Sequence, residues 1–81
     1  MLRQPYTIGG YHFELSREDV EHRLHNIEPE KVHKVFVEVN EKRYPIKQAL
    51  VVAESGLIRS GFTTQDAIRV LRKLGFKLGE E

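Results

Sequence analysis

Hydrophobic residues recur along the chain with two different periods, which predict strands and helices. Apolar and polar side chains alternate at residues 11–15 and, more strongly, at residues 34–39, where three valines share one face. Both stretches predict half-buried strands, because alternate side chains of a strand point to opposite faces. A short returning strand at Arg43-Tyr44 would close a β-hairpin with the second of them.

Three further segments show the three-to-four-residue spacing of amphipathic helices. The first is predicted over about residues 17–26 and the second over about residues 45–55, with Pro45 at the first helical position. Gly56 is expected to end the second helix as its C′ residue. The third helix is expected to begin after Thr63 or Thr64.

Two capping boxes support these helices, one at Ser16-x-x-Asp19 and one at Thr63-x-x-Asp66. Gly75 stops the third helix, and Phe76 follows it as the hydrophobic partner expected of a Schellman ending. Residues 76–78 then return as a last edge strand.

The predicted order is therefore β-α-β-β-α-α-β, an α+β fold in which a small antiparallel sheet packs on three helices. A β-hairpin and edge strands make up that sheet. We expect one domain over residues 11–78, preceded by a flexible or strand-like segment at residues 1–10 and followed by a tail at residues 79–81.

Composition narrows the class of protein. The chain has 81 residues and no cysteine, which excludes a disulfide framework and a thiolate metal site. Its longest purely apolar run is Ala49–Ala53, far short of the roughly 20 residues needed to cross a bilayer. These features predict a cytoplasmic protein that does not associate with a membrane.

Charge is distributed unevenly, although the net charge is only +1. Residues 1–30 contain six acidic and three basic side chains, whereas residues 42–77 contain eight basic and two acidic ones. Such a local excess favours an anionic partner. The alternative interpretation is a solvated basic face with no partner.

No catalytic or metal-binding arrangement emerges from the spacing of the chemically active residues. His22 and His25 can share one helical face, but no aligned third ligand accompanies them. The serines lack the pattern of a nucleophile elbow. We therefore expect no enzyme activity, no metal site and no cofactor, and the role of the two histidines stays open.

Basic, hydroxyl and amide side chains recur around the second and third helices. Lys and Arg neutralise phosphates, hydroxyls donate to phosphate oxygens, and Gln can pair with an adenine edge. On the third helix, Gln65, Arg69 and Arg72 have spacings that place them on one face. We therefore expect the chain to bind nucleic acid, with DNA favoured over RNA and the contacts going mainly to phosphates. The candidate residues are Arg43, Lys47, Gln48, Arg59, Thr64, Gln65, Arg69, Arg72 and Lys73.

A protein-interaction adaptor, or a subunit of a larger nucleic-acid-acting or defence complex, is the alternative function. It would dock an acidic partner through the same basic face, or pair through the edge of the hairpin. A surface patch formed by Phe36, Ile58 and Phe62 would favour this alternative.

Three stretches of the sequence together resemble the small N-terminal domain of McrA-like, modification-dependent HNH restriction endonucleases. They are residues 37–50, with a Tyr-Pro pair before a helix, then residues 61–64 and residues 70–76, which end in Leu-Gly-Phe. The resemblance covers about residues 34–78. Tyr44, Lys47, Phe62 and the Leu74-Gly75-Phe76 ending match the family pattern residue by residue.

This resemblance implies an accessory module of DNA-acting proteins. It implies no nuclease activity, because the HNH and modified-base domains are absent from these 81 residues. One departure concerns the turn of the predicted hairpin, where Asn40-Glu41 stands in place of the Asp-Gly that is frequent in the family.

Overall fold

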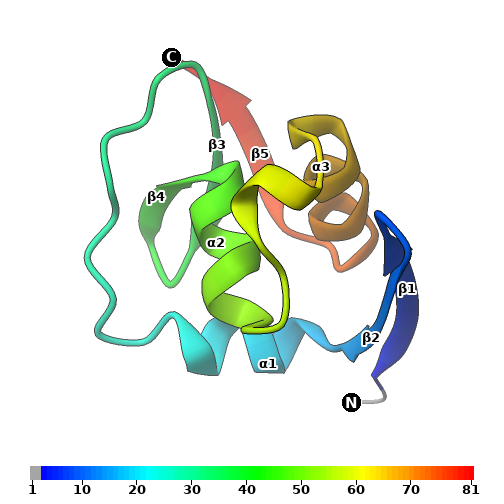
Figure 1. The fold of residues 1–81 in the computed structure, drawn as a ribbon. Coiled ribbons are helices and arrows are strands. Elements are labelled where there is room, and N and C mark those ends of the chain that lie inside the picture. Colours follow the sequence, from blue (N-terminus) through cyan, green and yellow to red (C-terminus); the bar gives the residue numbers. More distant parts are fainter. Residues whose placement is uncertain (1–2) are drawn as a thin grey trace.

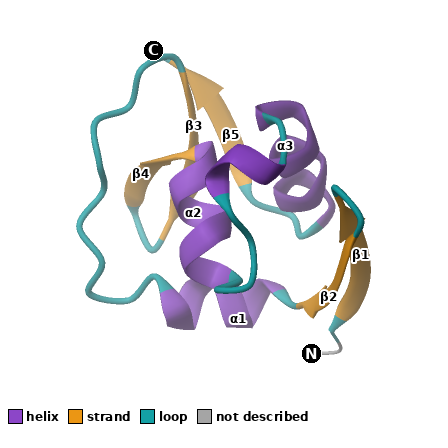
Figure 2. Ribbon diagram, viewed as in Figure 1, coloured by secondary structure: helices purple, strands orange, loops and turns teal. Residues whose placement is uncertain are grey.

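The structure is a computed structural model that describes residues 3–81, and it confirms an α+β fold (Figure 1). Helices and strands follow one another in the order β-β-α-β-β-α-α-β, so the prediction lacked the first strand. The strands form two separate antiparallel sheets (Figure 2). No helix in the described part of the chain is long and apolar enough to cross a membrane.

The two-stranded sheet is a hairpin of β1 (Gln4–Ile8) and β2 (Tyr11–Leu15). Gly9 and Gly10 join the strands with φ of 56° and 82°, the left-handed conformation that a two-residue hairpin turn requires. The first strand lies within the segment expected to be flexible or strand-like. It gives little alternation to detect, because Ile8 is its only buried residue.

The three-stranded sheet has the order β4-β3-β5, with β3 (Val35–Val39) in the centre. Strand β4 (Lys42–Pro45) and strand β5 (Lys77–Glu80) both run antiparallel to β3, and β5 includes two of the three residues expected as a tail. Val37 and Val39 point into the core. Phe36 points to the outer face of the sheet, where the Arg43 guanidinium lies 4.4 Å from the centre of its ring. The ring also occupies the space that a side chain at Gly79 would fill.

Three α-helices pack around the core: α1 (Arg17–Arg23), α2 (Ile46–Ala53) and α3 (Thr64–Lys73). A 3-10 turn, η1 (Arg59–Gly61), lies in the connection between α2 and α3. In Figure 1, α2 occupies the centre of the molecule, with α1 across one of its ends and α3 beside β5.

Both predicted capping boxes are confirmed. The Ser16 hydroxyl accepts from the Asp19 backbone N–H, the Thr63 hydroxyl accepts from that of Asp66, and each aspartate side chain accepts in return. The Schellman ending of α3 is also confirmed, because the Phe76 N–H donates to the Leu71 carbonyl while Gly75 adopts a φ of 91°.

Three helix boundaries differ from the prediction: the end of α1 and both ends of α2. Helix α1 ends at Arg23, three residues early, and Asn26 then turns the chain with a φ of 68°. Helix α2 begins after Pro45, which is its N-cap and the last residue of β4, so the predicted first helical position is wrong. Its C-cap, Glu54, is extended, and Gly56 instead leaves room for the Tyr11 side chain.

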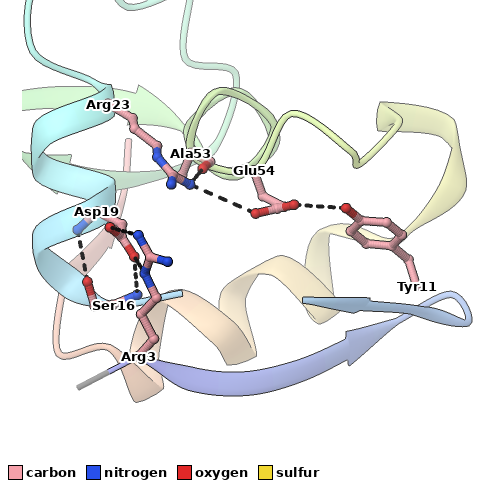
Figure 3. Close-up of polar contacts among 7 residues, drawn as sticks. All are labelled: Arg3, Tyr11, Ser16, Asp19, Arg23, Ala53 and Glu54. Atoms are coloured by element: carbon pink, nitrogen blue, oxygen red, sulfur yellow. Dashed lines mark hydrogen bonds and ion pairs between the residues drawn. The ribbon is translucent and has the colours of Figure 1, made fainter. Parts of the chain in front are cut away.

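A chain of polar contacts ties the hairpin to the helices (Figure 3). The Arg3 guanidinium donates to both carboxylate oxygens of Asp19, at 2.8 and 3.2 Å. The Tyr11 hydroxyl donates to Glu54 at 2.9 Å, and Arg23 donates to the Ala53 carbonyl at the end of α2. Together with buried Phe13 and Leu15, the Arg3–Asp19 and Tyr11–Glu54 contacts fix the hairpin against the rest of the core, whereas the Arg23 contact joins α1 to α2.

Candidate nucleic-acid interface

Helix α3 brings five of the nine candidate residues onto one exposed surface. Thr64 and Gln65 lie in its first turn, and Arg69, Arg72 and Lys73 follow on the same side of the helix. All five are exposed, whereas Ala67, Val70 and Leu71 are buried. The amphipathic spacing read from the sequence therefore places these polar side chains together at the surface.

Part of this surface carries positive charge that no acidic side chain of residues 3–81 neutralises in an ion pair. Arg69 forms an ion pair with Asp66 at 3.4 Å, with the arginine side chain 59% exposed. Arg72 and Lys73 form no ion pair with any residue of the described range 3–81. Because α3 ends at Lys73, the negative end of the helix dipole also favours these two cations.

The surface is hollowed on two sides of Ile68, which is half-buried and lies between the polar residues. One hollow follows the helix itself and is lined by Gln65, Ile68, Arg69, Arg72 and Lys73. The other lies between α3 and the three-stranded sheet, and we call it the α3–β5 groove. Its lining residues are Val35, Gln65, Ile68, Arg72, Leu78, Gly79 and Glu80.

A third hollow extends the surface past the first turn of α3 towards α2. Lys47 lies on one side of it, Thr64 on another, and His33 and Lys34 complete its rim. Half-buried Lys47 donates to the Arg59 carbonyl at 2.9 Å and lies 5.2 Å from the centre of the Phe62 ring. Lys34 was not among the candidate residues, because only the tertiary structure brings the start of β3 beside α3.

Asp66 determines what the first turn of α3 can bind. Its carboxylate accepts from the Thr63 backbone N–H, and hydrogen bonds with Thr63 hold the pKa of Asp66 below its usual range. Asp66 is thus ionised at neutral pH and already provides the negative charge that a helix N-terminus favours. A phosphate is therefore better accommodated near Arg72 and Lys73 than near Thr64.

Three candidate residues lie elsewhere. Arg43 projects from the outer face of the three-stranded sheet, opposite to the helices, where it covers Phe36 and pairs with Glu38 at 3.8 Å. Gln48 is buried, with only 4% of its surface exposed, so the structure places it inside the molecule. Arg59 is exposed but engaged by Glu30 through two hydrogen bonds of 2.8 Å.

The buried Gln48 carboxamide has a structural role, because it connects α2 to the loop before β3. Its oxygen accepts from the Glu30 N–H at 2.8 Å, and its nitrogen donates to the Glu28 carbonyl at 3.0 Å. The long loop between α1 and β3 runs along the outside of α2 and β4 (Figure 1), and Gln48 attaches it to α2. Sequence spacing had placed this amide beside the basic residues, and no local signal distinguished its buried face.

Residues 3–81 form neither a metal site nor the apolar patch that would favour an adaptor. No group of three or more His, Asp or Glu side chains within residues 3–81 is arranged to hold a metal ion. The patch expected of an adaptor does not form, because Phe36 and Phe62 are buried at 5% and 6% exposure while Ile58 is 70% exposed.

The fold and the α3 surface together define a small α+β domain with a cationic, hollowed helix face. Comparison with known families identifies the family to which the chain belongs. The SCO5918-like family model matches residues 6–81, nearly the whole chain, and the protein belongs to that family. No curated protein and no solved structure matches it.

Proposed function

We propose that this protein is a non-catalytic nucleic-acid-binding module that contacts phosphates through the exposed face of α3. One observation carries the proposal: Arg72 and Lys73 lie next to each other in the last turn of α3, exposed and without an ion-pair partner among residues 3–81. Arg69 adds a third cation, whose ion-pair partner is half-buried Asp66. Neutralising several phosphates in this way is the dominant source of affinity in many nucleic-acid complexes.

Duplex DNA is the partner that we favour. Helix α3 has 10 residues and is therefore about 15 Å long, and a helix of this kind fits the major groove of B-DNA. In that position Gln65 can pair with an adenine edge while Arg69, Arg72 and Lys73 contact the flanking phosphates. The resemblance to an accessory domain of DNA-acting endonucleases agrees with this proposal, and a role in restriction or defence stays part of it.

Fluorescence anisotropy tests the proposal with labelled duplex DNA, single-stranded DNA and RNA against the 81-residue chain. We expect duplex binding to weaken steeply between about 50 and 200 mM salt, because phosphate contacts release counterions. The variant Arg72→Gln with Lys73→Gln should reduce the salt slope by about two, one for each lost contact. Glutamine is preferred to glutamate here, because a negative charge in the last turn would oppose the helix dipole.

A matched control removes two positive charges from a different part of the surface. Lys31 lies in the loop between α1 and β3, and Lys42 lies in β4 with only a 3.8 Å contact to exposed Glu28. Lys31→Gln with Lys42→Gln changes the net charge by the same amount and should leave the salt slope unchanged. Equal losses in both double variants would show that net charge alone drives binding and would overturn the assignment to α3.

A further inference from the structure

Ile68 is an apolar side chain on the otherwise polar and cationic face of α3. One part of it packs against the core, and the side chain is half-buried. The rest borders both the α3–β5 groove and the hollow that follows the helix, which we call the α3 hollow. Burial of this remaining apolar surface by a ligand would be favourable. A ligand of this face should therefore place an apolar group on Ile68 and negative charge on the cations around it.

The two sides of Ile68 differ in charge. The α3 hollow is lined by Arg69, Arg72 and Lys73 and by no acidic residue of the range 3–81. The α3–β5 groove, in contrast, includes exposed Glu80 in its lining. Phosphates are therefore favoured on the side of Arg69 and Lys73, and Ile68 lies beside that path, where base edges follow the backbone of a bound duplex.

Base edges in the major groove of B-DNA differ in the apolar groups that they offer. Among the four standard bases, thymine alone places a methyl group there, at C5. Gln65 precedes Ile68 by three residues, so the two side chains are neighbours on α3, and both line the α3 hollow. A glutamine carboxamide can pair with N6 and N7 of adenine. An A·T base pair therefore offers a partner to each of these two residues.

We propose that Ile68 and Gln65 give this surface a preference for A·T base pairs. Ile68 contacts the thymine C5-methyl group, and Gln65 pairs with the adenine edge of the same or the adjacent base pair. This inference rests on the proposed binding of duplex DNA and adds the bases that are recognised. A 5-methylcytosine carries the same C5-methyl group, but its partner guanine offers two acceptors and no donor to the Gln65 oxygen. Gln65 therefore favours thymine as the source of the methyl group.

Fluorescence anisotropy of the 81-residue chain tests the proposal with four duplexes of equal length and charge. One contains A·T pairs in mixed order, and the second replaces its thymines by deoxyuridine, which removes only the C5-methyl groups. The third contains G·C pairs, and the fourth is the third with 5-methylcytosine. We expect thymine to bind about fourfold more tightly than deoxyuridine, the effect of burying one methyl group. The 5-methylcytosine duplex should gain a similar factor over unmodified G·C and still bind less tightly than the A·T duplex, because the adenine pairing is missing.

Three variants assign these differences to side chains. Ile68→Ala should bind the thymine and deoxyuridine duplexes equally and keep the salt slope. Ile27→Ala makes the same change at another half-buried isoleucine, which lies in the loop between α1 and β3, and should keep the fourfold ratio. Gln65→Ala should keep that ratio but bind the A·T and 5-methylcytosine duplexes equally. Each ratio compares two duplexes with one protein sample, so a partial loss of folded protein lowers both affinities alike.

The outcomes separate this inference from the proposed function on which it rests. Equal affinities of the wild type for thymine and deoxyuridine, with a steep salt dependence, would overturn the inference and leave the proposed function standing. A fourfold ratio retained in Ile68→Ala would overturn the assignment of the methyl contact to Ile68. Tighter binding of the 5-methylcytosine duplex than of the A·T duplex would overturn the pairing of Gln65 with adenine. Absence of binding to all four duplexes at 50 mM salt would overturn both proposals.

Discussion

Arg59 donates to both carboxylate oxygens of Glu30 at 2.8 Å, and this pair joins the loop before β3 to the turn before α3. The guanidinium holds the pKa of Glu30 below its usual value, so the carboxylate stays charged at neutral pH. Both side chains are about half exposed, at 48% and 51%. The positive charge of Arg59 is therefore already compensated, unlike that of Arg72 or Lys73.

This difference predicts an order of effects on nucleic-acid binding. Arg72→Gln should weaken duplex binding at low salt by about five- to tenfold, because it removes a cation available for phosphate. Arg59→Gln should change the affinity by less than about twofold, because its charge is compensated by Glu30. Anisotropy titrations of both single variants at 50 mM salt compare them directly. A larger loss in Arg59→Gln would place the phosphate contacts at η1 and not on α3.

Gln48 is the buried residue whose replacement should most affect the loop between α1 and β3. In Gln48→Ala the Glu30 N–H and the Glu28 carbonyl lose their partner, which should lower the free energy of unfolding by about 1–3 kcal/mol. Hydrogen exchange at Glu30 should accelerate. Urea denaturation measures the first effect, and NMR exchange measures the second. Gln65→Ala, at an exposed position of α3, should stay within about 0.5 kcal/mol of the wild type.

Much of the fold was predictable because local chemistry specifies it. The capping boxes at Ser16 and Thr63 and the Schellman ending at Gly75 depend on contacts within a few residues, and all three occur as predicted. Strand β1 was missed because its position is set by pairing with β2, and its own sequence shows one buried side chain. The division into two sheets likewise depends on long-range packing, which no local pattern reports.

The candidate site was predictable only where one helix carries it. The spacing of Gln65, Arg69 and Arg72 along α3 fixes their common face. Gln48 and Arg59 share the same basic and amide character but are engaged by the loop that contains Glu28 and Glu30, far away in sequence. Side-chain type alone could not separate a free cation from a compensated one.

Glu41 occupies a position where glycine is better suited. Asn40 and Glu41 form the two-residue turn between β3 and β4, with φ of 53° and 67°. Both values are left-handed, as in a type I′ turn, and asparagine tolerates this conformation better than glutamate does. Glu41→Gly should therefore raise the free energy of unfolding by about 0.5–1 kcal/mol. In urea denaturation, Asn40→Gly should give a smaller gain, and destabilisation by Glu41→Gly would contradict the proposed strain.

Asp19 should make the stability of the protein sensitive to acid. The Arg3 guanidinium and the Ser16 N–H hold the pKa of Asp19 at about 2, below its ordinary 3.8. A carboxylate with a lowered pKa in the folded state stabilises it above the ordinary pKa, and this contribution is lost as the pH falls towards 2. Asp19→Asn should therefore be less stable at pH 7 and lose less stability between about pH 5 and pH 2. Arg3→Gln should raise the pKa of Asp19 towards its ordinary value, which carboxyl NMR titration measures. Parallel stability profiles of Asp19→Asn and wild type in urea denaturation from pH 7 to 2 would show that this carboxylate does not contribute.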